Sequence, residues 1–413
     1  MAKVSERWAK LKMRIQKKLR IKDPDILDVC MATVLSARTK ADPVWLQICG
    51  PSSSGKTEIL RMFGDCSIIL QFTGMTENAL ISGYVKKDEE GNPIECSLLA
   101  DLNRKALIIK DMSELMSKPP EQREKLEAIL RDAFDGYVKR AFGGEAHYKG
   151  FKTKFALLAA TTSAHEAVDT ARSKAFGQRF IQFNMIGIPD ADREEFFEHC
   201  LSMAATTDDW REDLRDRLVS FIEWVKDRVP AGLSCQRNKL FPLCDLAARA
   251  RTPFIRDRFQ NNSIVLPPEP EFGIRLGKQI YAIMCLVKWL GGRPKRIARR
   301  IAESCIVPRA RADIMRKIHQ AKRPVKIKEI LDGMKVSPTT VRRHLEELKF
   351  LDLVHVQDIG SAEGRYQLFS IAKPWRPHAD LMFRELPELK ENRTVDKLIE
   401  AGLDPGFMAI LEG

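Results

Sequence analysis

One stretch of eight residues constrains the fold of this chain more than any other feature. It follows the pattern GxxxxGK[ST] and reads Gly50, Pro51, Ser52, Ser53, Ser54, Gly55, Lys56, Thr57. An apolar run at 44–49 precedes it and a helical pattern at 57–63 follows it, which is the context that makes this motif specific. Glycine-rich backbone at a helix N-terminus surrounds phosphate groups with N–H donors. The stretch therefore predicts a nucleotide-binding P-loop, with Lys56 on the β- and γ-phosphates and the Thr57 hydroxyl on Mg²⁺.

A P-loop needs a carboxylate from a neighbouring strand to hold the metal ion. The run at 106–111 is mostly apolar and ends in Asp111, which we expect at the carboxyl end of that strand and on Mg²⁺. A glutamate usually follows this aspartate, but Met112 stands there. Glu114 is the nearest carboxylate that could polarise an attacking water. The pattern thus predicts ATP and Mg²⁺ as cofactors, whereas hydrolysis depends on Glu114.

Short apolar runs alternate with helical patterns in the first half of the chain. The runs lie at 44–49, 67–72, 106–111, 154–162 and 179–183. This alternation predicts an α/β domain built on a mainly parallel sheet. The pattern then becomes wholly helical, and we interpret that part as a lid on the core. The predicted divisions are basic helices at 1–40, the core at 41–190, the lid at 191–292, a helical unit with a β-hairpin at 293–372, and a tail with a helix near 392–401 at 373–413.

The charge of the chain favours a polyanionic partner. Its 413 residues include 69 Lys and Arg against 56 Asp and Glu, a formal net charge of +13. No run approaches the roughly 18 apolar residues of a membrane span, and the basic N-terminus lacks an apolar signal region. The nine cysteines show no CxxC spacing, which favours reduced thiols. We expect a soluble cytoplasmic protein without a membrane partner.

The order of these motifs resembles that of the AAA+ ATPases, and among them the minichromosome-maintenance (MCM) type of helicase. The likeness covers about 25–290 and is greatest at 97–183. It implies an AAA+ core with a lid, assembly into a homo-oligomeric ring, expected to be a hexamer, and action on DNA. By position, Thr162 falls at the sensor that orients the attacking water, and Arg179 at the arginine finger that reaches a neighbouring subunit's γ-phosphate. The chain departs from the family in having too few residues before the core for the MCM DNA-binding collar.

The resemblance also implies a second, cis-acting sensor arginine from the lid. Arg275 opens a helix at 275–290 after a proline-rich break, as in many AAA+ proteins. Arg237 competes for this role, because its setting is more similar to the MCM arrangement. We prefer Arg275.

Two segments are candidate DNA contacts. The first, at 137–154, reads as two strands joined by a glycine-containing turn, and the family places such a hairpin in the pore of the ring. Lys149 and Lys152, with His147 and Tyr148 between them, could contact phosphates and bases there. A solvated hairpin without a ligand is the alternative.

The second segment resembles a winged helix-turn-helix. Helices are predicted at 312–320, 327–331 and 337–351, followed by strands at 353–358 and 365–371. We expect five residues on or near the outer face of the third helix: Thr339, Thr340, Arg342, Arg343 and His344. Helices of this kind dock into DNA grooves, although some winged helices bind only protein.

Two functions fit these patterns. The first is a hexameric MCM-like DNA helicase or translocase that replicates a phage or mobile element, working with partner proteins of that system. The second is an ATP-switched DNA-binding protein, such as a loader, a transposition targeting factor or a transcription regulator, with little or no unwinding. Met112 favours the switch, and the lysine-bearing hairpin favours the motor. An ATP-binding protein whose C-terminal unit only mediates oligomerisation explains the charge distribution poorly.

Overall fold

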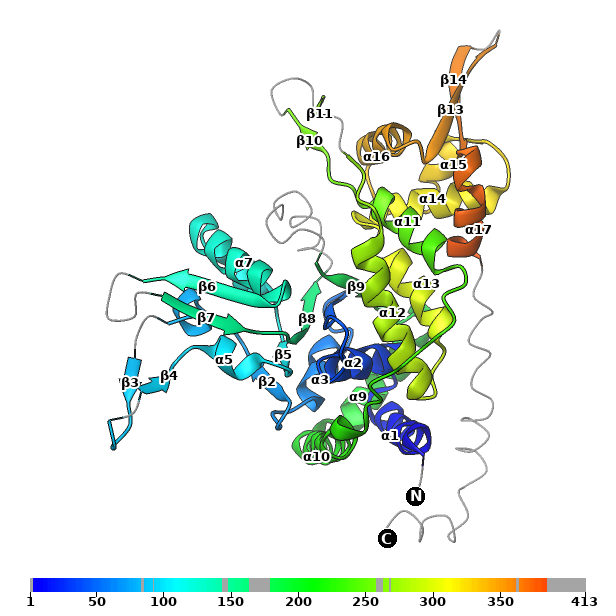
Figure 1. Cartoon of the computed structure of the whole chain (residues 1–413). Coiled ribbons are helices and arrows are strands. Elements are labelled where there is room, and N and C mark those ends of the chain that lie inside the picture. Colours follow the sequence, from blue (N-terminus) through cyan, green and yellow to red (C-terminus); the bar gives the residue numbers. More distant parts are fainter. Residues whose placement is uncertain are drawn as a thin grey trace.

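The computed structural model describes residues 3–82, 85–91, 93–142, 148–162, 179–257, 263–266, 269–361 and 364–384 (Figure 1). Its centre is a sheet of five parallel strands in the order β2-β5-β8-β1-β9. Their bounds are β2 Ile69–Phe72, β5 Ala106–Ile109, β8 Ala156–Thr162, β1 Trp45–Gly50 and β9 Ile181–Asn184. Each of the five predicted apolar runs overlaps one of these strands, although β1 and β9 each extend one residue beyond their runs. The predicted α/β core with a parallel sheet is therefore confirmed.

Both faces of the sheet are buried, which explains why its strands read as continuous apolar runs. Along β5, Ala106 and Ile108 join the apolar cluster on one face, and Leu107 and Ile109 join the cluster on the other. The first cluster lies under α2 (Asp25–Ser36) and the lid, and the second under α7 (Pro120–Phe134). The sheet therefore divides the core into two layers of side chains.

The N-terminal helices are part of this core. Every residue of α2 is buried, and α2 packs on β8 and on the lid helix α12 (Ile274–Trp289). Helix α1 (Val4–Leu19) packs on α10 (Thr207–Val225), where Trp8 stacks on Phe221 with 5.4 Å between the ring centroids. Both helices expected within 1–40 are therefore present.

The remaining core and lid elements surround the sheet (Figure 1). They are α3 Lys56–Met62, α4 Glu77–Leu80, α5 Leu98–Leu102, α6 Ser113–Ser117, α9 Arg193–Ser202, α11 Leu240–Ala250 and α13 Pro294–Ser304. Helix α13 lies within the sequence interval 293–372 but packs on α12 and β9. A short hairpin, β10 (Ile255–Arg256) with β11 (Ile264–Leu266), connects α11 to α12.

Two further hairpins extend from the sheet on the side away from the lid (Figure 1). One pairs β6 (Tyr137–Ala141) with β7 (Tyr148–Lys152) and matches the hairpin expected from the sequence. The other pairs β3 (Val85–Lys87) with β4 (Pro93–Glu95) and was not expected.

The C-terminal unit contains the predicted helices and strands. They are α14 Arg309–Ala321, α15 Ile327–Leu331, α16 Pro338–Phe350, β13 Val354–Ser361 and β14 Gly364–Ile371. A short strand, β12 (Val325–Lys326), completes an antiparallel sheet of order β12-β14-β13. Helix α17 (Arg376–Phe383) packs on α11, α13 and α14 and was not expected, while the helix predicted near 392–401 lies outside the described residues. Within the described ranges, no helix has the length and apolar character needed to cross a membrane.

Candidate functional site

The P-loop leaves the sheet where three strand ends meet. Gly50 ends β1 and lies in register with Thr162 at the end of β8. Gly55 has φ +84°, a left-handed conformation that favours glycine, and the chain enters α3 directly after it. A Cβ on Gly55 would meet no atom within 4 Å, so the loop presents open space at the start of the helix. Ser52 is exposed beside it.

Lys56 lies folded across its own loop. Its Nζ donates to the carbonyl oxygens of Gly50 and Pro51, at 2.9 Å and 2.5 Å, and lies 3.3 Å from Ser54 Oγ. Burial lowers the pKa of Lys56, and the charges of Cys49 and Asp111 act in the opposite direction. The Lys56 ammonium is therefore held at the site, close enough to Asp111 to interact with it.

The metal-ligand candidates lie at the same edge. Asp111 is exposed two residues after β5, and the Met112 N–H donates to the Ala160 carbonyl at 2.9 Å, which fixes the turn that presents the carboxylate. Thr57 is exposed in the first turn of α3. A hydroxyl and a carboxylate are the hard oxygen donors that Mg²⁺ takes together with phosphate oxygens and waters. The residues present therefore fit an Mg²⁺–nucleotide.

The two candidates for water activation differ in placement. Met112 is buried in the apolar cluster under α7, so its position offers nothing to an attacking water. Glu114 is exposed, and its carboxylate lies against Gly74, where an added Cβ would come within 2.0 Å of Oε1. Gly74 follows β2, which lies on the opposite side of β5 from the P-loop strand. In this conformation the Glu114 carboxylate thus lies on the β2 side of β5.

Arg179 occupies the opposite edge of the sheet. It precedes β9, whereas the P-loop follows β1, and the six residues of β1 span about 20 Å. The Arg179 guanidinium is buried and lies 3.2 Å from the Asp135 carboxylate, measured from Nη2 to Oδ2. Burial lowers the pKa of Arg179, Asp135 raises it, and the nearby charges of Arg275 and Arg131 lower it further.

The position of helix α12 brings Arg275 close to Arg179. Gln279 follows Arg275 by one helical turn, is buried, and donates from Nε2 to the Arg179 carbonyl at 2.9 Å. The Gln279 Oε1 accepts from the N–H of Trp45, at the start of β1. Residues four apart share a helix face, so α12 carries Arg275 to the same edge. Arg237 lies elsewhere on the lid, exposed, with its guanidinium 5.9 Å from the Tyr281 ring centroid.

The hairpin lysines lie on different faces of β6–β7. Lys149 is ion-paired with Glu95 of β4, with 3.3 Å from Nζ to Oε1, and its side chain is 12% exposed. Lys152 is exposed on the other face, with Tyr148 on the same strand. His147 lies outside the described residues.

On α16, most predicted contact residues face solvent. Ser337 caps the helix by accepting from the Thr340 N–H at 3.2 Å. Arg342, Arg343 and Thr339 are exposed, and Thr340 is half-buried. The prediction for His344 is wrong: its side chain is buried and lies 2.7 Å from Glu347, between Nδ1 and Oε2. Position 344 is three residues after Val341 and four before Leu348, so helical spacing turns it inward with them.

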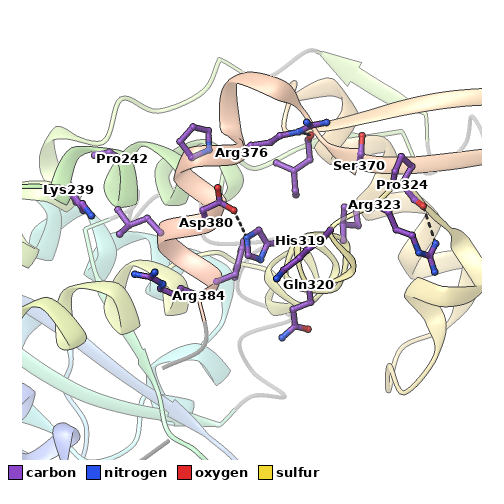
Figure 2. Close-up of a pocket in the computed structure, with 16 residues that line it drawn as sticks. Lys239, Pro242, His319, Gln320, Arg323, Pro324, Ser370, Arg376, Asp380 and Arg384 are labelled. Atoms are coloured by element: carbon purple, nitrogen blue, oxygen red, sulfur yellow. Dashed lines mark hydrogen bonds and ion pairs between the residues drawn. The ribbon is translucent and has the colours of Figure 1, made fainter. Parts of the chain in front are cut away.

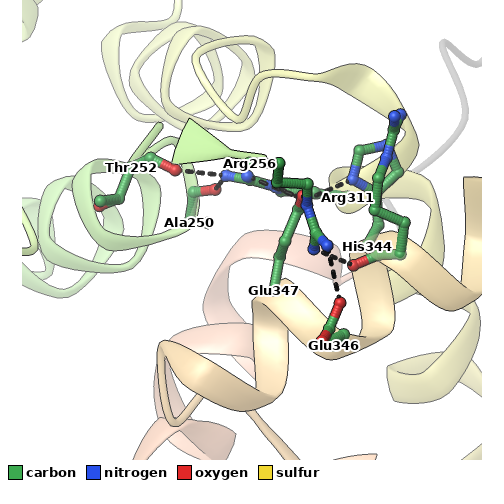
Figure 3. Close-up of polar contacts among 8 residues, drawn as sticks. Ala250, Thr252, Arg256, Arg311, His344, Glu346 and Glu347 are labelled. Atoms are coloured by element: carbon green, nitrogen blue, oxygen red, sulfur yellow. Dashed lines mark hydrogen bonds and ion pairs between the residues drawn. The ribbon is translucent and has the colours of Figure 1, made fainter. Parts of the chain in front are cut away.

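A buried ion cluster, missed by sequence reasoning, fixes α16 to the lid (Figure 3). Arg311 bonds Glu347 Oε2 from Nη2 at 3.0 Å and donates from Nη1 to the carbonyls of Ala250 and Thr252. Arg256 of β10 donates from Nε to Glu347 Oε1 at 3.0 Å. Burial alone would raise the pKa of Glu347, but the hydrogen bond with His344 and the charges of both arginines outweigh it and lower the pKa to about 2.

A wide hollow surrounds α17, between α11 and α14 (Figure 2). Basic side chains outnumber acidic ones in its wall, which includes Lys239, Lys322, Arg323, Arg376, Arg384 and Asp380. Asp380 is held 2.8 Å from His319, from Oδ1 to Nε2. None of the predicted site residues lines this hollow.

The structure thus gathers the candidates into separate groups. The P-loop, Asp111 and Thr162 meet at the carboxyl edge of the sheet, and Arg179 and Arg275 meet at the amino edge. Asn184 was missed by sequence reasoning: it ends β9 beside Cys49, and its buried Oδ1 has no hydrogen-bond partner. A comparison with models of known protein families and with characterised proteins gives no match to this chain.

Proposed function

We propose that this chain is an ATP hydrolase of the AAA+ type that works on DNA as a ring of identical subunits, most similar to an MCM-like helicase or translocase. One observation carries the proposal. The phosphate-binding residues and the arginine pair lie at opposite edges of one sheet, so a single chain cannot bring them onto one nucleotide. A head-to-tail neighbour can, because such an interface joins two different surfaces and closes into a ring.

The residues at the carboxyl and amino edges of the sheet would have different roles toward the nucleotide. Lys56 would turn from its loop carbonyls to the phosphates, and Thr57 and Asp111 would hold Mg²⁺. Arg179 and Arg275 of the next subunit would stabilise charge on the transferred phosphoryl group. The proximity of Arg275 to Arg179 favours action across the subunit seam, in place of the cis role expected from the sequence.

Two exposed surfaces support action on DNA. The hairpin β6–β7 presents lysine and tyrosine side chains to solvent. We interpret the C-terminal unit as a winged helix-turn-helix, because it contains three helices and an antiparallel sheet. Arg342 and Arg343 lie on the exposed side of α16. Its fixed attachment through Glu347 would transmit changes in the lid to that helix.

The decisive experiment compares wild type with Lys56→Ala and Arg179→Ala in ATP hydrolysis, in oligomer mass with nucleotide and Mg²⁺, and in strand displacement. We expect DNA-stimulated hydrolysis and unwinding by wild type, and loss of about 10³-fold or more in turnover for Arg179→Ala. Lys17→Ala, on the exposed side of α1, is the control. Equal unwinding by wild type and Lys56→Ala would exclude the motor, and a protein that stays monomeric would exclude the ring.

A second candidate is the ATP-switched DNA-binding protein. The buried Met112 and the orientation of Glu114 toward Gly74 favour it, because both leave the attacking water without a base. Such a protein would bind ATP and DNA tightly with negligible turnover, so hydrolysis with saturating DNA separates the two candidates.

The role of α16 has its own test. Each phosphate contact contributes about 0.9 to the slope of log affinity against log salt on duplex DNA. Arg342→Ala with Arg343→Ala should therefore weaken duplex binding and lower that slope by about 2. Lys349→Ala, at the exposed end of the same helix, should change it little. An unchanged slope in the double variant would exclude α16 as the duplex contact.

A further inference from the structure

The hollow around helix α17 has walls from both the lid and the C-terminal unit (Figure 2). Its volume is about 1390 Å³, which exceeds the roughly 300–1,000 Å³ of a small-molecule site. Five lysines and arginines and one acidic residue line it: Lys239, Lys322, Arg323, Arg376, Arg384 and Asp380. Apolar side chains that are at least partly exposed line it as well, among them Pro242, Pro377 and Leu381. This space, which we name the α17 hollow, therefore fits a polymer segment with both acidic and apolar groups.

Most of the basic charge in the α17 hollow is not balanced within the described part of the chain. Asp380 is already held by His319, and Arg323 is ion-paired with Glu329. Four cations of the hollow form no ion pair with another described residue: Lys239, Lys322, Arg376 and Arg384. The hollow therefore has the charge to attract an acidic ligand.

A further cation beside the hollow also lacks a partner. The Nη2 atom of Arg299, on α13, is buried and has no hydrogen-bond partner among the described residues. Burial lowers the pKa of Arg299, Glu303 raises it, and the nearby charges of Arg296 and Arg384 lower it further. A buried donor without an acceptor costs free energy. An anionic group near Arg384 would therefore be favourable for both arginines.

Two of the cations lie at the start of α17. Helix α14 runs antiparallel to α17, because His319 bonds Asp380 and the Arg316 guanidinium lies 5.9 Å from the Phe383 ring centroid. Lys322 follows α14 and therefore lies toward the start of α17. Arg376 is the first residue of α17.

The other two cations lie at the end of α17. The guanidinium of Arg249, in the last turn of α11, lies 5.2 Å from the ring centroid of Trp375, which immediately precedes α17. The start of α11, where Lys239 stands, is therefore toward the end of α17, where Arg384 follows the helix. Figure 2 shows Lys239 and Arg384 on the same side of the hollow.

The sequence that follows Arg384 has the chemistry that the α17 hollow requires. Residues 385–413 lie outside the described structure and include seven Asp and Glu against three Lys and Arg, whereas the whole chain carries +13. Three acidic residues and two leucines stand in the first seven positions, which read ELPELKE. Seven extended residues reach up to about 25 Å, and the eight residues of α17 span about 12 Å. The segment 385–391 is therefore long enough to return along the whole of α17.

We propose that residues 385–391 bind in the α17 hollow of their own chain, with their carboxylates on its cations and their leucines against its apolar wall. A DNA duplex could pair its phosphates with the cations, but it has no apolar side chains for Leu381 and the prolines. The bound segment would join the lid, at Lys239, to the C-terminal unit, at Lys322. This contact depends neither on ATP nor on DNA, so it goes beyond the proposed function.

The test is zero-length cross-linking of the full chain with a carbodiimide, which joins a lysine amine to a carboxylate in contact with it. Mass spectrometry should find both Lys239 and Lys322 joined to carboxylates of 385–391. Those joined to Lys322 should lie further along the segment than those joined to Lys239, because Lys322 is at the far end of α17. Lys154 and Asp42, 3.0 Å apart between Nζ and Oδ1, are the internal standard. Lys328, an exposed lysine of α15 outside the hollow, gives the background.

Charge reversal in the α17 hollow should release the segment. Arg376→Glu with Arg384→Glu replaces two cations and leaves both lysines in place. Because an exposed ion pair contributes up to about fivefold, the double variant should lower the yield of these cross-links by about 2- to 30-fold. Lys335→Glu with Arg365→Glu makes the same charge change on exposed residues outside the hollow and should keep the wild-type yield. Unlabelled chains mixed with heavy-isotope-labelled chains should give cross-links within one chain only.

Several results would overturn this assignment. The first is that Lys239 and Lys322 form no cross-link with 385–391, or no more than Lys328 forms, while the internal standard is joined. The second is a wild-type yield in the Arg376 and Arg384 double variant, with folding checked by circular dichroism. Cross-links between light and heavy chains would assign the hollow to a second copy instead. Absent cross-links, together with a lower salt slope of duplex binding in the double variant, would assign it to DNA. No readout uses ATP turnover, so failure here leaves the proposed function untouched.

Discussion

The carboxylate of Asp135 holds the guanidinium of Arg179, with 3.2 Å between Oδ2 and Nη2. Asp135 also lines a cavity of about 490 Å³, together with Lys40, Arg104 and Lys154. One acidic residue therefore contacts the candidate arginine finger and lines a cavity whose other charged lining residues are basic. The Arg179 charge is compensated within its own chain, so under the proposed function it would have to leave Asp135 before acting on a neighbour's nucleotide.

Replacing Asp135 should make Arg179 easier to release. Because Asp135 is 61% exposed at its side chain, the pair is worth at most about 1 kcal/mol. Asp135→Asn should therefore raise the ATP turnover of the assembled protein by up to about fivefold. Steady-state hydrolysis at saturating ATP measures this.

Asp132→Asn is the matched control for that change. Asp132 lies in the last turn of α7, just before its C-cap Asp135, and is ion-paired with Arg140 at 3.2 Å. Its turnover should equal that of wild type. A fall in turnover for Asp135→Asn, in the direction of Arg179→Ala, would instead make Asp135 a positioning residue for the finger.

Arg275 should complement a P-loop defect across subunits. In a head-to-tail ring, an Arg275→Ala subunit keeps an intact P-loop and a Lys56→Ala subunit keeps intact arginines. An equimolar mixture of the two inactive proteins should regain about a quarter of wild-type turnover, because about a quarter of random seams pair the intact halves. Arg237→Ala should keep its turnover when assayed alone. No recovery in the mixture would place Arg275 on the nucleotide of its own chain.

Much of the core could be predicted because its signals are local. The strands are apolar runs buried on both faces, and the P-loop pattern requires a strand before it and a helix after it. The bounds of α15 could also be predicted from residues that are close in the sequence. At the start of α16, the Ser337 side chain caps the helix by accepting a hydrogen bond from the Thr340 N–H. Such features depend on neighbours in sequence, so one sequence is enough to locate them.

The rest depends on pairing between distant segments. Lys149 and Lys152 read alike in the sequence, and only the register of β6 with β7 and the contact with Glu95 separate their faces. The sequence predicts that Arg275 acts on the P-loop of its own chain. In the structure, however, Gln279 anchors helix α12, which carries Arg275, to Arg179 and Trp45. Local patterns contain no information on which edge of the sheet a lid helix reaches.

Glu114 is the residue that decides between motor and switch. If this chain hydrolyses ATP, Glu114 must turn from Gly74 toward the nucleotide, and Glu114→Gln should lower turnover by about 10²- to 10⁴-fold with ATP affinity unchanged. Glu121→Gln, an 82% exposed glutamate on α7 paired with Lys125, should behave like wild type. Rapid-quench hydrolysis and nucleotide titration measure the two quantities. Wild-type turnover in Glu114→Gln would mean that another group activates the water.

The stability of the C-terminal unit should depend on the buried Glu347. Its pKa of about 2 lies below the ordinary glutamate value, so its charge stabilises the folded chain above about pH 4.5. That contribution should disappear as the pH falls from about 4.5 toward 2. At neutral pH, Glu347→Gln leaves the Arg311 charge buried without its carboxylate and should cost about 3–5 kcal/mol of unfolding free energy.

The adjacent Glu346 separates this effect from a general loss of charge. Its side chain is 48% exposed, against 5% for Glu347, although both bond Arg256. Glu346→Gln should cost no more than about 1 kcal/mol. Denaturant unfolding at several pH values checks the comparison: the difference between wild type and Glu347→Gln should shrink below about pH 4.5, because protonation makes the wild-type carboxyl neutral as well. Equal costs for the two variants, or a difference independent of pH, would mean that the cluster does not hold α16 to the lid through the Glu347 charge.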